Sequence, residues 1–214
     1  MMSVLGKGVR IVKRNSKFIL LGTGIFLISI LIGYLNAEEI QKMASELMKE
    51  LEQIARKINE NNSPLYTFWV IFQNNLLASL SMLGLGIFLG FYPALALLSN
   101  GILLGFMLKI SALKGINPFS VFFLGILPHG IFELFAVIVA ASIGMKYGIL
   151  IIRMLANLAN NSRRSRLVDD FKTSLNELPY IVGAIVVLLL LAAVIESTVT
   201  PLLINSFLGD QMVS

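Results

Sequence analysis

Five long apolar runs with few charged residues are the feature that most constrains the fold of this chain. A helix needs roughly 20 residues to cross the ~30 Å hydrocarbon core of a membrane, and each run is about that long. Of the 214 residues 57% are hydrophobic and only 14% are charged, whereas soluble domains carry about 25% charged residues. The runs are Phe18–Leu35, Phe68–Tyr92, Ala94–Leu113, Phe119–Ile143 and Tyr180–Leu203. They predict a multi-pass membrane protein.

The runs are continuously apolar rather than alternating, which favours helices over barrel strands, and a helix satisfies its own backbone in lipid. We therefore expect an all-α polytopic bundle of five transmembrane helices. Residues 18–35 form an N-terminal anchor and residues 68–203 a four-span core. Pro93 is suited to the first turn of a helix, so Phe91–Ala94 predicts a tight hairpin between the second and third spans.

The basic residues predict the orientation of the chain. They cluster in residues 1–17 and in the loop 144–179, and five spans put both segments on one side. Because cytoplasmic segments of membrane proteins are enriched in Lys and Arg, we place both in the cytoplasm of a cell-membrane protein. Residues 36–66 and the C-terminal tail 204–214 then lie outside the cell.

The outer segment 36–66 carries apolar residues at alternating steps of four and three, which predicts an amphipathic helix. Two interpretations remain open: a helix lying on the membrane or on the ends of the spans, or a coiled-coil surface for a second copy or a partner. The apolar positions are Ile40, Ala44, Leu47, Leu51, Ile54 and Ile58.

The inner loop begins with Tyr147–Leu158, an apolar segment interrupted by Arg153 and too short to span. We predict a separate interfacial helix here. Arg163, Arg164 and Arg166 follow, and we expect them to contact lipid phosphates, mainly as a determinant of topology.

Two motifs of paired glycines allow helix backbones to approach closely. They are Gly86-x-x-x-Gly90 and Gly101-x-x-x-Gly105. Packing within one chain is the first interpretation, and a dimer interface is the second.

The fourth span holds the only histidine of the chain, His129, with Glu133 one helical turn later. Spacing i, i+4 places both on one face of a helix, and Pro128 and Gly130 beside them predict a bend and close packing. A charged carboxylate at the centre of a bilayer costs about 2.5–3.5 kcal/mol, so Glu133 must face the bundle or a wet cavity.

Other spans offer polar partners for this pair: Asn74, Asn75, Asn100 and Glu196. Since the first span offers almost none, we expect the last four spans to form the working bundle and the first to be peripheral.

Three roles for this polar set remain open. It is a structural hydrogen-bond network, a proton or ion path, or a catalytic or metal site. The third is the least favoured, because H-x-x-x-E is not the H-E-x-x-H motif and the chain has no cysteine and one histidine. A metal would then need residues from two chains across a two-fold axis. We expect no metal, no other cofactor, no nucleic-acid partner and no enzymatic activity.

Several of these residues together resemble the stage II sporulation protein M family over about Phe68 to Pro201. The residues that carry the resemblance are Asn74, Asn75, Gly84, Gly86, Gly90, Pro93, Asn100, Gly101, Gly105, Pro128, His129, Gly130, Glu133, Ile195, Glu196, Thr200 and Pro201.

The resemblance implies a multi-pass integral membrane protein. In endospore formers, the family's named member is similar to a scaffold that belongs to an engulfment complex with two partners that degrade peptidoglycan. We therefore expect a non-enzymatic, homodimeric scaffold for envelope-remodelling partners. The alternative is a proton- or ion-coupled transporter or channel that uses Glu133 and His129.

Overall fold

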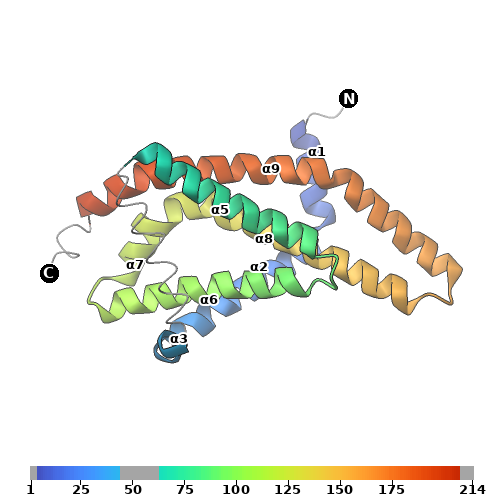
Figure 1. The fold of residues 1–214 in the computed structure, drawn as a ribbon, viewed down its shortest axis with the longest axis horizontal. Coiled ribbons are helices and arrows are strands. Elements are labelled where there is room, and N and C mark those ends of the chain that lie inside the picture. The colour runs from blue at the N-terminus through green and yellow to red at the C-terminus, as the bar shows by residue number, and fades with distance from the viewer. Residues whose placement is uncertain (1–3, 44–62, 208–214) are drawn as a thin grey trace.

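The computed structural model describes residues 4–43 and 63–207 of the chain, and these residues fold into helices joined by short turns (Figure 1). No strand occurs within the two described ranges. The elements are α1 (Val4–Arg14), α2 (Ser16–Leu35), α3 (Ala37–Met43), α5 (Pro64–Leu85), α6 (Phe91–Leu113), α7 (Pro118–Ser120), the π-helix η1 (Val121–Ile126), α8 (Leu127–Ala156) and α9 (Asn161–Phe207).

Five of the helical segments are long and apolar enough to cross a membrane. They are α2, α5, α6, the continuous unit formed by α7, η1 and α8, and α9. This confirms the predicted all-α bundle with five spans.

The turn between α5 and α6 lies a few residues earlier than predicted. Helix α5 ends at Leu85, residues 86–90 form the turn, and Pro93 is the third residue of α6 rather than its first. Gly90 has φ 72°, a left-handed conformation that glycine adopts without steric cost. The second span is therefore shorter than the apolar run, because α5 ends at Leu85 and the chain reverses direction through residues 86–90.

The α5–α6 turn packs directly on α8. A Cβ atom added to Gly86 would collide with the backbone of Gly144, and one added to Gly148 would collide with the backbone of Gly90. Pro93 is also buried against this part of α8. The glycines of both elements are thus required for backbone-to-backbone contact.

Helix α2 is not peripheral, and that prediction was wrong. It packs closely along α6, and a Cβ at Gly105 would collide with the backbone of Ile30, one at Gly101 with Ser29, and one at Gly33 with the backbone of Ile102. Close approach of two apolar helices needs small residues rather than polar ones. The scarcity of polar side chains in the first span therefore did not indicate its place in the bundle.

Helix α8 is the central helix of the bundle. Its segment from Ala136 to Leu150 is almost entirely buried, and it contacts α2, α5, α6 and α9. Small residues, including Ala140, Ala141 and Ser142, let these neighbours approach from several sides.

The predicted separate interfacial helix over Tyr147–Leu158 was wrong. Helix α8 continues without a break to Ala156, and Tyr147 and Leu150 are buried in the bundle. No proline or glycine turn interrupts this stretch, so the helix of the fourth span continues through the segment expected to be a loop.

Only residues 157–160 connect α8 to α9, which is 47 residues long. The side chain of Asn160 accepts a hydrogen bond from the backbone N–H of Arg163 at 3.1 Å, as expected at a helix start. Arg163, Arg164 and Arg166 are exposed on the first turns of α9, and their contact with lipid phosphates stays a prediction.

The predicted outer amphipathic helix is described only at its beginning. Ile40, half-buried on α3, is the one position of its apolar face within the described residues. Ala44, Leu47, Leu51, Ile54 and Ile58 lie outside them.

Candidate functional site

A cavity of about 500 Å³ lies between α5, α6, η1, α8 and α9. Apolar side chains form most of its wall. All six polar residues singled out in the sequence line it, together with Thr200: Asn74, Asn75, Asn100, His129, Glu133 and Glu196. Helix packing thus brings four separate spans to one site.

The helix that carries His129 and Glu133 changes its winding just before them. Residues 121–126 form a π-helix, in which the N–H of Leu127 bonds the carbonyl of Phe122, and α8 then starts with Pro128 in its first turn. Proline cannot donate the usual helical hydrogen bond, and its ring needs space against the preceding turn. A π-turn accommodates such a ring, and π-turns occur frequently at functional sites.

His129 faces α9 with both of its ring nitrogens. Its Nε2 lies 4.0 Å from Oε2 of Glu196, and its Nδ1 lies 3.2 Å from the hydroxyl of Thr200. Glu196 and Thr200 are one turn apart on α9, so one face of that helix lies against both nitrogens of the imidazole ring.

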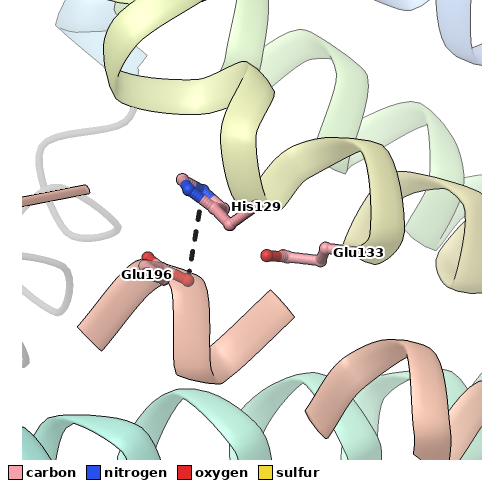
Figure 2. A group of neighbouring side chains, drawn as sticks. All are labelled: His129, Glu133 and Glu196. Atoms are coloured by element: carbon pink, nitrogen blue, oxygen red, sulfur yellow. Dashed lines mark ion pairs between the residues drawn. The ribbon is translucent and has the colours of Figure 1, made fainter. Parts of the chain in front are cut away.

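Glu133 points into the same space from the next turn of α8 (Figure 2). The side-chain amide of Asn75 on α5 hydrogen-bonds its carboxylate. One ligating atom from each of His129, Glu133 and Glu196 lies within 4.8 Å of the other two. All three side chains are half-buried.

Asn74 and Asn100 line the cavity less directly. Both are exposed on their helices, and the side chain of Asn100 donates to the carbonyl of Ala96 in its own helix at 2.8 Å. They add polar surface to the cavity wall.

The cavity carries two carboxylates and an imidazole with no Lys or Arg among the described residues that line it. Such a wall attracts cations. Two carboxylates that are removed from water and close to each other are unfavourable, and a nearby positive charge offsets that cost. A proton or a metal ion would meet this need. A second chain is not required to collect the donors, so the expectation that a metal site needs a two-fold axis was wrong.

Thr200 entered the sequence analysis only through the family resemblance and was not predicted as a site residue. Its signal in the sequence is the i, i+4 spacing from Glu196 on the last span. The partner of its hydroxyl comes from a helix distant in the chain, and no spacing along the sequence encodes that contact.

A second polar cluster, which the sequence analysis did not predict, lies farther along α8, at Lys146 and Tyr147. Lys146 donates hydrogen bonds to Oδ1 of Asn15 at 2.8 Å and to the hydroxyl of Ser174. The hydroxyl of Tyr147 donates to the carbonyl of Ser174 at 3.3 Å, and Arg14 forms an ion pair with Glu177. These contacts join α1, α8 and α9.

Five apolar helices, four of which line the cavity, define an integral membrane protein of the multi-pass class. Residues 22–201 match the family profile of Stage II sporulation protein M. The chain belongs to this family, as the resemblance in its polar residues indicated.

A relative in Methanocaldococcus jannaschii, described as an uncharacterized protein, is 28% identical over 195 residues. The match covers 87% of this chain and 83% of the relative. No solved structure matches the chain significantly.

Proposed function

We propose that this protein binds a small cation within the membrane bundle and carries it across the membrane. The observation that carries the proposal is the meeting of His129, Glu133 and Glu196 in one cavity. Intramembrane ionisable residues that face a cavity mark ion pathways and proton relays. The function is non-enzymatic and was the alternative in the sequence analysis.

The arrangement of the cavity supports movement of the ion as well as binding. Four spans contribute to its wall, so a small shift of one helix changes the distances between the donors. The π-turn before Pro128 adds a local departure from regular helix beside these donors. A site shared by several helices is the usual arrangement in transporters, where one part of the bundle moves against another.

Flux measurements in liposomes test this proposal. Purified protein is reconstituted with a pH-sensitive dye inside, and in parallel with metal-sensitive dyes, and a gradient is applied. We expect flux from the wild type and a loss of at least about tenfold in Glu133→Gln, which removes the charge but keeps the shape. Glu39→Gln is the matched control, because Glu39 is an exposed carboxylate on α3. Absence of flux from the wild type with every ion overturns the proposal.

A scaffold for envelope-remodelling partners is the second candidate. The end of α8 and the start of α9 form a hairpin that extends beyond α5 and α6 (Figure 1). Leu155, Leu158 and Leu175 are exposed on it, as a contact surface would require. The outer segment that begins at α3 is a second partner surface, for a homodimer or another protein.

Crosslinking in membranes tests the scaffold candidate. We expect Leu47→Asp combined with Leu51→Asp to abolish self-association or partner association while the protein still inserts. Unchanged crosslinking would remove the outer segment as the partner surface.

We also propose that the N-terminus lies in the cytoplasm and the C-terminus outside. The two basic segments, α1 and the first part of α9, precede the apolar parts of α2 and α9 on the same side, since Arg14 at the end of α1 pairs with Glu177, just before the apolar part of α9. Their shared position supports the orientation predicted from the excess of Lys and Arg on the cytoplasmic side.

A further inference from the structure

We infer that the cation held in the cavity is a divalent first-row transition-metal ion, bound by His129, Glu133 and Glu196. The inference rests on the proposed function, because it names the class of cation for that same site. Four properties of the site support it: the spacing of the donors, their charge, their chemistry and the contacts that orient them.

The spacing of the donors is close to that of a mononuclear metal site. Bonds of about 2.0–2.2 Å from metal to nitrogen or carboxylate oxygen place two ligands of one ion about 3–4.4 Å apart. The three donor atoms lie within 4.8 Å of one another, and Nε2 of His129 is 4.0 Å from Oε2 of Glu196. Side-chain movements of a few tenths of an ångström complete the site.

The charge of the donors matches a divalent ion. Two carboxylates and a neutral imidazole carry a charge of −2, so a divalent cation makes the cluster neutral. A monovalent cation leaves one negative charge within the membrane, where each unpaired charge is costly. Two protons would also neutralise the cluster, and the experiment below separates that case.

The chemistry of the donors favours transition metals over other divalent ions. Mg²⁺ and Ca²⁺ prefer an all-oxygen site, whereas imidazole with carboxylates suits Mn²⁺, Fe²⁺, Co²⁺ and Zn²⁺. The chain has no cysteine, so thiolate-dependent sites are excluded. The cavity volume of about 500 Å³ leaves room for water in the remaining coordination positions.

Hydrogen bonds from neighbouring residues orient the donors, as they do for the ligands of known metal sites. When Nδ1 of His129 carries the hydrogen, the hydroxyl of Thr200 accepts it at 3.2 Å, and Nε2 is free on the side that faces Glu196. The Asn75 amide holds the carboxylate of Glu133. A ligating histidine nearly always donates its other N–H in this way, and a ligating carboxylate is itself hydrogen-bonded.

Metal binding to the purified protein in detergent tests the inference without any transport. Affinity tags that contain histidine are removed first. We titrate Mn²⁺ and follow the loss of the free-ion signal by electron paramagnetic resonance, and we measure bound Zn²⁺ by elemental analysis after dialysis. We expect about one ion per chain, with affinity at least about 100-fold lower in Glu133→Gln and Glu196→Gln. Glu39→Gln should bind like the wild type.

His129→Cys provides a readout that a structural role would not give. It introduces the only thiol of the chain, so a thiolate-to-cobalt charge-transfer band on addition of Co²⁺ reports direct coordination at position 129. Monodispersity and helix content of each variant are checked. If the glutamine variants do not fold, the metal stoichiometry of the wild type and the charge-transfer band of His129→Cys test the inference.

The two assays separate the inference from the proposed function. Proton flux from the wild type without stoichiometric binding of Mn²⁺, Zn²⁺ or Co²⁺ overturns the metal inference and leaves cation transport standing. Stoichiometric metal that depends on Glu133 and Glu196 supports the inference, and if no ion crosses the liposome membrane the transport proposal alone is overturned. Binding that persists with unchanged affinity in both Glu133→Gln and Glu196→Gln places the metal elsewhere and overturns the inference.

Discussion

The two polar clusters on α8 lie about 25 Å apart along the helix, at a rise of 1.5 Å per residue, and they differ in how their polar groups are used. At the Lys146 end, the amine donates to Asn15 and Ser174, and both of those side chains are buried. At the His129 end, two carboxylates and an imidazole surround a cavity. The first cluster joins three helices through direct contacts, whereas the second leaves coordination capacity for a ligand.

The two clusters show that a polar group inside a bundle is not by itself a sign of function. A buried polar group that finds a protein partner fixes the packing of helices and specifies their arrangement. Groups of one charge sign that line a cavity require an outside partner instead. Loss of the first kind of group should reduce stability, and loss of the second kind should reduce ligand binding.

Lys146→Met is expected to give the largest effect on stability. Methionine keeps the apolar stem, but Asn15 and Ser174 lose their donor, and an unsatisfied buried polar group costs about 1–3 kcal/mol. We expect a loss of about 3 kcal/mol in the free energy of unfolding, measured by denaturation in detergent. Glu133→Gln is the matched control at the other end of α8, with an expected change below about 1 kcal/mol. Equal losses of unfolding free energy in the two variants would contradict the distinction between a structural cluster and a ligand-binding one.

Thr200→Val is expected to have an intermediate effect on stability and a larger one on binding. Valine keeps the shape of the buried side chain and removes the hydrogen bond to His129, which contributes about 1 kcal/mol. If the imidazole ligates a metal, loss of its orienting partner should weaken binding by about 10–100-fold. Thermal unfolding and Mn²⁺ titration measure the two effects, and Thr200→Ser should restore binding. A stability loss without any change in affinity would assign Thr200 a structural role only.

Arg14→Ala is expected to give the smallest effect. Its ion pair with Glu177 is partly exposed, with 39% of the arginine side chain and 18% of the glutamate side chain accessible. Pairs of this kind contribute about 0–1 kcal/mol and weaken with salt. Unfolding at low and at high ionic strength checks the prediction. A salt-independent loss as large as that of Lys146→Met would contradict the small contribution expected of this ion pair.

The predictions from sequence were strongest where the membrane imposes a rule on a single segment. The five spans follow from length and hydropathy, and the inward orientation of Glu133 follows from the cost of a charge in lipid. The errors arose where neighbouring helices decide the outcome. Tyr147–Leu158 was predicted as an interfacial helix because it is too short to span alone, yet α8 continues through it and buries Tyr147.

The first span shows the same limit. Its lack of polar side chains predicted a peripheral helix, but Gly33 of α2 and Gly105 of α6 allow the two backbones to meet. Packing between apolar helices depends on the shape of both surfaces, and one helix sequence contains only half of that information.

The amino-acid sequence was sufficient to predict that this chain crosses the membrane as helices and that the few ionisable side chains within its spans face away from lipid. Each is a local requirement, because a lipid environment offers no hydrogen bonds to an unpaired backbone or carboxylate. The packing of the helices places Glu196 and Thr200 of α9 against His129 and Glu133 of α8, and Lys146 against Asn15. These contacts join residues far apart in the chain, and they depend on how whole helices pack rather than on the spacing of residues within one helix.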